Sequence, residues 1–291
     1  MDWINAIVQG VLLGGLYALL AAGLSLSFGV MRLVNLAHGD FAILAAYLSV
    51  VIVNATGMNP FVTLPIVVPL MALLGYALQR SLLNRSMMIG PLSPLLVTFG
   101  LSVVIQNVLL DIFKADSRGL DAGAIENASI HFSDQVAIGV YPLLTFIVAV
   151  LVLGGLSLLL VRTQLGRALR ATSDDHTAAR LIGIHNRHLY AVAMAIALGT
   201  VAIAGVFIGI RTTFGPTDGP TRLIAAFEAV IIGGLGSVWG TLVGGIVLGV
   251  AQAVGNQISP SFQLLAGHLV FLAILMFRPT GLFPSATARQ V

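Results

Sequence analysis

Runs of about twenty residues with almost no charged side chain dominate this sequence of 291 residues. A helix of that length, rising 1.5 Å per residue, crosses the roughly 30 Å hydrocarbon core of a bilayer. Backbone polar groups in hydrocarbon need internal partners, so each run is expected to be helical. The expected spans are residues 4–30, 41–53, 61–83, 92–113, 136–161, 189–210, 241–257 and 262–277.

The low content of charge excludes an ordinary soluble domain. Asp, Glu, Lys and Arg make up 9% of the chain, against about 25% in an average soluble domain. The mean hydropathy is +1.01. Although the net charge is +3, the 14 cations form no dense stripe, so nucleic acid is not an expected partner. The lack of cysteine excludes disulfide frameworks, thiolate metal sites and cysteine nucleophiles.

The predicted fold is an all-α polytopic membrane protein with a single transmembrane domain over residues 1–291 and eight or nine transmembrane helices. The short span 41–53 is expected to extend backward into the polar residues 35–40. Two longer polar segments, residues 114–135 and 162–188, are expected to lie outside the membrane on opposite sides.

The region after the sixth span is expected to be irregular. Residues 211–222 contain two prolines and several turn-forming residues and are not expected to be helical throughout. Only about ten apolar residues then precede Gly233, Gly234 and Gly236. This spacing predicts a broken or re-entrant helix, whose non-helical backbone must be buried in protein.

The distribution of positive charge predicts the orientation. With the N-terminus outside, ten of the 14 cations fall on the cytoplasmic side together with the C-terminus. These are Arg32, Arg80, Arg85, Arg162, Arg167, Arg170, Arg180, Arg187, Arg278 and Arg289. The segment 114–135 is then extracytoplasmic, and the segment 162–188 is a cytoplasmic loop.

Catalytic chemistry finds little support in the sequence. A P-loop needs a lysine followed by Ser or Thr, and the one lysine, Lys114, is followed by alanine. His185 and His188 lack a third ligand in register, so no metal site is expected. Ser237 and His268 are of the residue types that serve as nucleophile and base, but the sequence around Ser237 does not match a nucleophile elbow. We therefore expect no catalytic residues.

Ionisable residues inside spans are the sharper signals, because a charge at mid-bilayer costs from about 2.5 kcal/mol upward. Glu228 is the clearest case, and either it satisfies exposed helix termini or it lines a substrate path. Asn35, His38 and Asp40 are expected at the cytoplasmic end of the second span, where they could cap its helix. Arg222 is interpreted as an anchor at the membrane surface.

Glycines recur at the spacing that lets helix backbones approach closely. We expect most of them to serve helix packing. The glycines concerned are Gly10, Gly14, Gly15, Gly199 and Gly205, together with the two GxxxG pairs Gly240/Gly244 and Gly245/Gly249.

A short helix is predicted in the loop 162–188. Ser173 is expected to cap it, Asp174 and Asp175 suit its N-terminal dipole, and Gly183 ends it. Its apolar face is expected to consist of Ala178, Ala179, Leu181 and Ile182. Such a helix suits docking into a groove of another protein, although it could instead rest on lipid headgroups.

Four segments together carry a family resemblance. They are GVLLGGLYALLAAGLSLSFGVMRLVNLAHGD (residues 10–40), LGRALRATSDDHTAARLIGI (165–184), AVIIGGLGSVWGTLVGGIVLG (229–249) and FRPTGLF (277–283). With them the chain resembles the membrane subunits of ABC importers for branched-chain amino acids, the LivH/LivM permeases, and more closely LivH. The resemblance covers nearly the whole chain.

This resemblance implies a function and a set of partners. The loop helix would be a coupling helix, with Asp174, Asp175, Ala178, Ala179, Leu181 and Gly183 at the contact with an ATPase. The implied partners are a second permease, two cytoplasmic ATPases that hold ATP and Mg, and a periplasmic binding protein. The permease itself would lie in a bacterial inner membrane. This chain itself would bind no cofactor. The substrate path would involve Glu228, Asn35, His38, Gly233, Gly234 and Gly236.

The substrate and one other function class stay open. A hydrophobic amino acid is the first choice, and urea, short amides or small aromatic acids are alternatives, since Glu228 departs from the residue expected in many amino-acid members. A stand-alone channel or secondary transporter is the competing class. Ion coupling usually needs carboxylates on the path, and Glu228 is the only one evident in the sequence.

Overall fold

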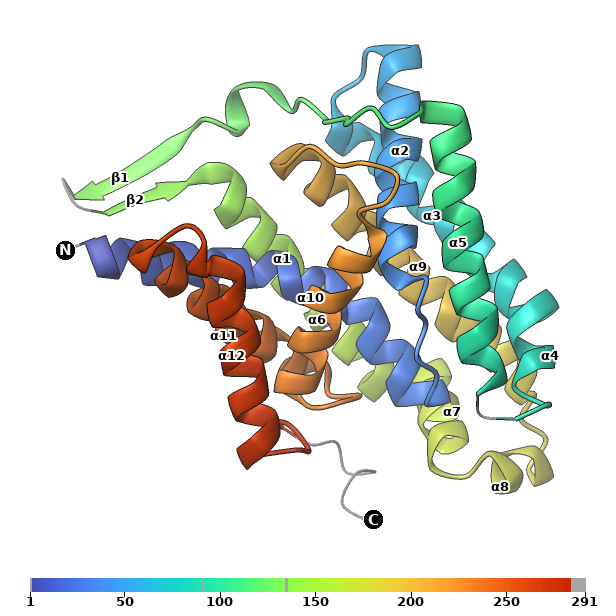
Figure 1. Cartoon of the computed structure of the whole chain (residues 1–291). Helices are drawn as coiled ribbons and strands as arrows, with labels where there is room; N and C mark the ends of the chain where they lie inside the picture. The colour runs from blue at the N-terminus through green and yellow to red at the C-terminus, as the bar shows by residue number, and fades with distance from the viewer. Residues whose placement is uncertain (1, 91, 134–135, 284–291) are drawn as a thin grey trace.

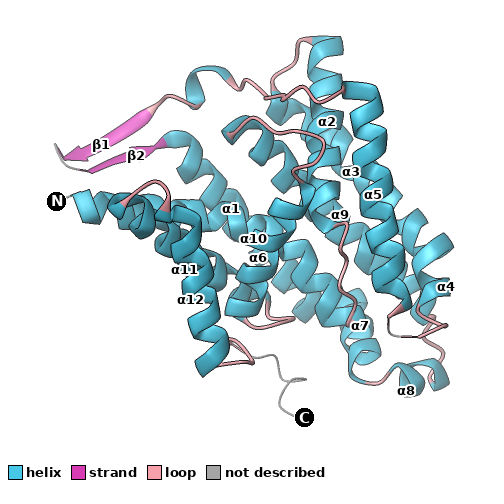
Figure 2. Ribbon diagram, in the orientation of Figure 1, coloured by secondary structure: helices cyan, strands magenta, loops and turns pink. Residues whose placement is uncertain are grey.

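Helices form nearly all of the structure, a computed structural model that describes residues 2–90, 92–133 and 136–283 (Figures 1 and 2). The helices are α1 (Asp2–Met31), α2 (His38–Thr56), α3 (Pro60–Leu78), α4 (Asn84–Ser86), α5 (Ser93–Phe113), α6 (Val140–Arg162), α7 (Gln164–Asp174), α8 (His176–Leu181), α9 (Asn186–Arg211), α10 (Gly219–Gly233), α11 (Val238–Ile258) and α12 (Phe262–Phe277). A π-helical segment, Gln79–Leu83, joins α3 to α4, and a 3-10 turn, Gly123–Ile125, precedes an antiparallel hairpin of β1 (Ser129–Ser133) and β2 (Val136–Gly139).

Seven helices of the described residues are long and apolar enough to cross a membrane, which confirms the all-α polytopic membrane fold. One of these spans continues from α3 through the π-helical segment to Ser86. Two further helices are shorter, α10 with 15 residues and α12 with 16. At 1.5 Å per residue α10 is about 22 Å long, less than the roughly 30 Å of hydrocarbon. The number of crossings therefore stays a prediction.

Two helices form the centre of the bundle. Most residues in the apolar stretches of α1 and α9 are buried, whereas most of those in α5, α6 and the span that begins with α3 are not. Figure 1 shows α5 and α12 at the margins, with α1 passing between them. Large apolar side chains of α5 and α12 are exposed, as expected for surfaces that face hydrocarbon.

Glycines allow the central helices to touch through their backbones. A Cβ atom added at Gly14 of α1 would lie 2.4 Å from the Cα of Ile246 in α11, and one at Gly249 would lie 2.3 Å from the carbonyl oxygen of Gly10. A Cβ at Gly205 of α9 would lie 2.2 Å from a carbonyl oxygen of α2. The predicted packing role is thus confirmed for these glycines. Gly199 differs, because its nearest neighbour would be an ordinary 3.7 Å away.

Two non-helical segments enter the bundle and bring two helix N-termini together. Residues 32–37 lead into α2, and residues 212–218 lead into α10. The region 211–222 is therefore interrupted between Arg211, which ends α9, and Gly219, in line with the sequence prediction. The helix starts touch, since a Cβ at Gly39 would lie 1.9 Å from the carbonyl oxygen of Gly219. The carboxylate of Asp40 lies against Gly219 and accepts a 2.9 Å hydrogen bond from Gln106. A carboxylate suits this place because helix N-termini carry partial positive charge.

The second span begins at His38, as its expected extension into residues 35–40 implies, and its first turn is buried. The Nε2 atom of His38 lies 2.8 Å from the carbonyl oxygen of Leu20, in the interior of α1, and both His38 and Asp40 are 1% exposed. Both residues lie in the first turn of the second span, as expected, and its cytoplasmic location stays a prediction. The extended residues 32–37 carry the chain inward before α2 begins at His38, so the start of this helix is buried within the bundle.

The bundle has two dissimilar faces, which we call the loop face and the hairpin face. The loop face carries α7 and α8, and the hairpin face carries β1 and β2 (Figure 1). The polar segment 114–135 reaches the hairpin through an irregular stretch. There Arg118 exchanges two backbone hydrogen bonds, of 2.9 and 2.8 Å, with Phe214 in the segment that leads into α10. Residues 134 and 135 of that segment, like Arg289, lie outside the described residues.

Candidate functional sites

The loop 162–188 folds into two helices on the loop face. Thr163 caps α7 by accepting a 3.0 Å hydrogen bond from the backbone of Gly166. The hydroxyl of Ser173, near the end of α7, donates a 2.6 Å hydrogen bond to the carbonyl of Gly29 in α1. This bond ties the loop to the end of the central helix α1.

The start of the predicted loop helix needs a correction. It is α8, which begins at His176 and not at Asp174, and Asp174 is the last residue of α7. The cap is Asp175, whose Oδ1 accepts hydrogen bonds from the backbones of Thr177 (2.7 Å) and Ala178 (3.0 Å). These two bonds hold the pKa of Asp175 below its usual value. Ser173 does not cap α8, because its hydroxyl is bound to α1.

The end of α8 is as predicted. Gly183 has a φ of +86°, a left-handed conformation that glycine adopts without steric cost. Its N–H donates to the carbonyl of Arg180 at 3.1 Å, and the N–H of Ile184 donates to the carbonyl of Ala179 at 3.0 Å. These two bonds satisfy the last carbonyls of the helix.

The apolar residues around α8 do not share one face. Ala179 is buried against the rest of the chain, whereas Ala178 is exposed. Leu181 is 85% exposed and Ile182 is 74% exposed. The predicted single face therefore divides, with Ala179 holding α8 in place and Leu181 and Ile182 projecting from the loop face.

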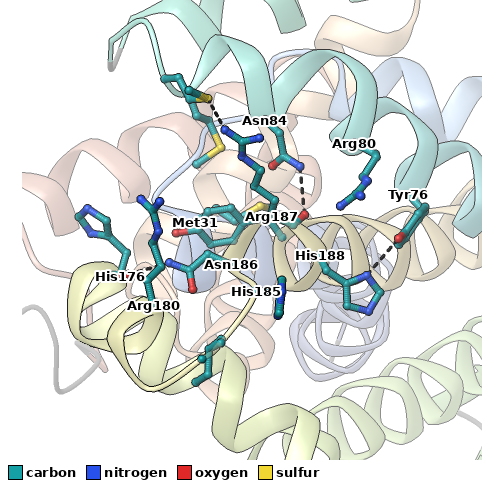
Figure 3. Close-up of a pocket in the computed structure, with 15 residues that line it drawn as sticks. Met31, Tyr76, Arg80, Asn84, His176, Arg180, His185, Asn186, Arg187 and His188 are labelled. Carbon is teal, nitrogen blue, oxygen red and sulfur yellow. Dashed lines mark hydrogen bonds between the residues drawn. The ribbon is translucent and has the colours of Figure 1, made fainter.

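Behind α8 lies an open groove of about 1130 Å³ that the sequence did not reveal. Figure 3 shows part of its lining: Tyr76 and Arg80 lie at one side of the view, Arg180 lies at the other, and Arg187 lies between them. None of the 15 lining residues in Figure 3 is acidic, and they include three arginines and three histidines. Arg80 and Arg187 are remote in sequence, so only the fold could show that they share one groove.

Glu228 lies in α10 and has a partner in α12. Its Oε1 forms a short hydrogen bond with Nδ1 of His268, and its side chain is 6% exposed. Ser237, the alternative partner of His268 as a nucleophile, caps α11 instead by accepting a 3.1 Å hydrogen bond from the backbone of Gly240. The serine–histidine hypothesis finds no support, because His268 pairs with Glu228.

A cavity of about 120 Å³ adjoins this pair. Five helices contribute to its wall, namely α1, α9, α10, α11 and α12. On the polar side, the hydroxyl of Tyr17 donates a hydrogen bond to Oε1 of Gln252. Leu16, Leu20 and Leu264 contribute apolar side chains to the lining.

The other residues expected on the substrate path lie elsewhere. Asn35 precedes α2 and accepts a 3.1 Å hydrogen bond from the backbone of Ala37, and neither Asn35 nor His38 lines the cavity. Gly233 ends α10, and Gly234 and Gly236, with φ values of +105° and +79°, form the turn into α11. The expected break in the helix is present, but its glycines are separate from the cavity beside Glu228.

Comparison with known proteins decides the family. The model of the branched-chain amino acid transport system/permease component family matches residues 6–278. The chain belongs to this family. The permease is 28% identical to the high-affinity branched-chain amino acid permease protein BraD of Pseudomonas aeruginosa, with 99% of this chain and 98% of BraD covered.

Two further relatives are also permease proteins of branched-chain amino acid transport systems. The LivH permease protein of Salmonella typhimurium is 27% identical to the permease, with 99% of this chain and 98% of LivH covered. The LivM permease protein of Escherichia coli is 26% identical, with 92% of this chain and 68% of LivM covered. No solved structure matches the permease. The resemblance to the LivH/LivM permeases is thus confirmed.

Sequence reasoning missed three features of the permease. It did not foresee that Asp40 is buried within the bundle, did not pair His268 with Glu228, and did not foresee the groove that three arginines line. The signal for the pair was present, since two ionisable residues in separate apolar segments are costly unless they meet. The spacing of 40 residues gave no means to infer that they do.

Proposed function

We propose that this permease is the membrane-spanning subunit of an ATP-driven importer of aliphatic amino acids. Two cytoplasmic ATPase subunits would hold ATP and Mg, and an extracytoplasmic binding protein would deliver the substrate. The names of BraD and LivH support this substrate class. Urea, short amides and small aromatic acids are the alternative substrates within the same function.

The observation that carries the coupling role is the exposed pair Leu181 and Ile182 at the end of α8, 85% and 74% exposed. Large apolar side chains on a capped helix favour a protein partner over water. The helix is tied to the bundle through Ala179 and, by way of α7, through the bond between Ser173 and α1. Movement of a partner that grips α8 would therefore be transmitted to α1.

A second permease subunit completes the proposal. This chain is similar both to LivH and to LivM, so two paralogues of the same fold could pair about a pseudo-twofold axis. With the loop face in the cytoplasm, α8 meets the ATPases and the hairpin face meets the binding protein. This orientation follows the charge asymmetry of the loops, in a bacterial inner membrane with the N-terminus outside.

Reconstitution of the complete complex in proteoliposomes tests the proposal. Leucine delivered by the binding protein should enter only when ATP is supplied. Leu181→Asp should abolish this uptake because a charge replaces the apolar contact, while Leu181→Met, which keeps that contact, should transport normally. Normal ATP-driven uptake by Leu181→Asp would contradict the coupling role. Leucine flux through this chain alone, without ATP or partners, would instead show a channel or secondary transporter.

A further inference from the structure

The cavity beside Glu228 lies between α10, α12 and the middle of α1, and it opens toward the surface of the bundle, since Ile224 and Leu264 in its wall are 52% and 57% exposed. Three of its lining residues, Leu16, Tyr17 and Leu20, occupy the middle of α1. Its volume of about 120 Å³ is well below the roughly 300–1,000 Å³ of pockets for drug-sized ligands. An occupant must therefore be a small solute. The chain that leads into α10 is non-helical, and discontinuous helices commonly frame transporter binding sites near the membrane midplane.

Two residues of opposite charge line the cavity, both from α10. Glu228 is buried, and its Oε2 has no hydrogen-bond partner. Arg222 is partly buried; its Nη2 donates a 3.3 Å hydrogen bond to Thr212, and its buried Nε has no partner. A buried charged group without full pairing is costly, so each points to an additional polar partner. The two residues are six positions apart, about 9 Å along the helix axis.

We propose that this cavity is a transit site for a zwitterionic aliphatic amino acid, with the substrate ammonium bound by Glu228. The substrate carboxylate lies toward Arg222, and the aliphatic side chain packs against Leu16, Leu20 and Leu264. This assignment rests on the proposed transport function. The assignment names the lining residue that recognises each group of the substrate.

The neighbouring polar residues fit this assignment. His268 contacts one carboxylate oxygen of Glu228 and leaves the other without a partner. Tyr17 and Gln252 bond to one another and add no net charge to the wall. Glu228 is therefore the only carboxylate among the residues that line the cavity, so the ammonium has one anionic partner there.

Direct binding to the purified transporter complex, without the binding protein, tests the assignment. Isothermal titration with leucine should show binding by the wild-type complex. Glu228→Gln keeps the size of the side chain but removes its charge, and it should weaken binding at least about tenfold, since a hydrogen bond to a charged group contributes about 1.5–3 kcal/mol. Glu126→Gln is the matched control, because Glu126 lies in the segment before β1 and bonds to the backbone of Ala122. It should bind leucine as the wild type does.

Substrate analogues separate the two charged ends. Isopentylamine, which lacks the carboxylate, should still bind and should lose affinity in Glu228→Gln. 4-Methylpentanoate, which lacks the ammonium, should be insensitive to Glu228→Gln. Equal leucine affinity in wild type and a folded Glu228→Gln complex, or no measurable leucine binding by the wild type, would overturn the transit site. If only the transit site is wrong, the wild-type complex should still show ATP-driven leucine uptake. If the proposed function is wrong, the wild-type complex should show no such uptake.

Discussion

Replacing Gly14 with alanine should force α1 and α11 apart. The added Cβ would lie 2.4 Å from the Cα of Ile246 and 2.7 Å from the carbonyl oxygen of Gly245. The first distance is 1.0 Å short of the 3.4 Å at which ordinary van der Waals contact begins. Both neighbours are backbone atoms, so neither can rotate away, and one helix must shift by about 1 Å.

The cost of this shift extends along the whole helix contact. The seam also contains Gly10, Gly245 and Gly249, each in close backbone contact across it. A gap of 0.5–1 Å already removes about a quarter to a half of the dispersion energy of the contacts concerned. This lost dispersion energy and the overpacking at the new methyl group should together lower the free energy of unfolding by about 1–3 kcal/mol.

Equilibrium unfolding in mixed detergent and SDS micelles measures this loss. Gly100→Ala in α5 is the matched control, because Gly100 is helical and exposed and a Cβ there meets nothing within 4 Å. It should leave stability unchanged or raise it by up to about 1 kcal/mol, since alanine is the better helix former. Equal stability of the two variants would refute the argument that backbone contact at Gly14 holds the central helices together.

Three other substitutions have defined outcomes. Gly183→Pro should abolish ATP-linked uptake without preventing membrane insertion. Proline can neither adopt a φ of +86° nor donate the hydrogen bond that closes α8. Normal uptake would argue against the docking role. Asp175→Ala should speed hydrogen exchange in the first turn of α8 at neutral pH. In the wild type, the protection by Asp175 should persist above the usual carboxyl pKa of 3.8 and disappear as the pH falls through its lowered pKa. Protection that is unchanged in acid would contradict this. Tyr141→Phe removes the buried hydrogen bond to the carbonyl of Phe207 and should cost about 1 kcal/mol of unfolding free energy, whereas an unchanged value would show that this bond adds nothing net.

Several features followed from the sequence because they depend on local chemistry or on the solvent. Apolar runs of spanning length must satisfy their own backbone in hydrocarbon, which requires helices whatever their neighbours are. Gly183 ends α8 because of its own backbone freedom. The break at Gly233, Gly234 and Gly236 has the same cause, since two of these three glycines have positive φ.

The start of α8 shows where local reasoning stops. Ser173 and Asp175 both carry an oxygen that can cap a helix. The choice between them depends on the hydroxyl of Ser173, which is bound to the carbonyl of Gly29 in another helix. No local pattern records that contact, so the sequence predicted a cap two residues too early.

The sequence by itself determined that the long apolar segments are helical and which family the chain resembles, because hydrophobic length and glycine placement act within each segment. Only the tertiary structure decided that Glu228 meets His268, that the starts of α2 and α10 touch, and that arginines from separate helices share one groove. In each case the deciding energy comes from contacts between helices. Those contacts depend on how the helices are arranged in space. The spacing of the residues along the chain does not encode that arrangement.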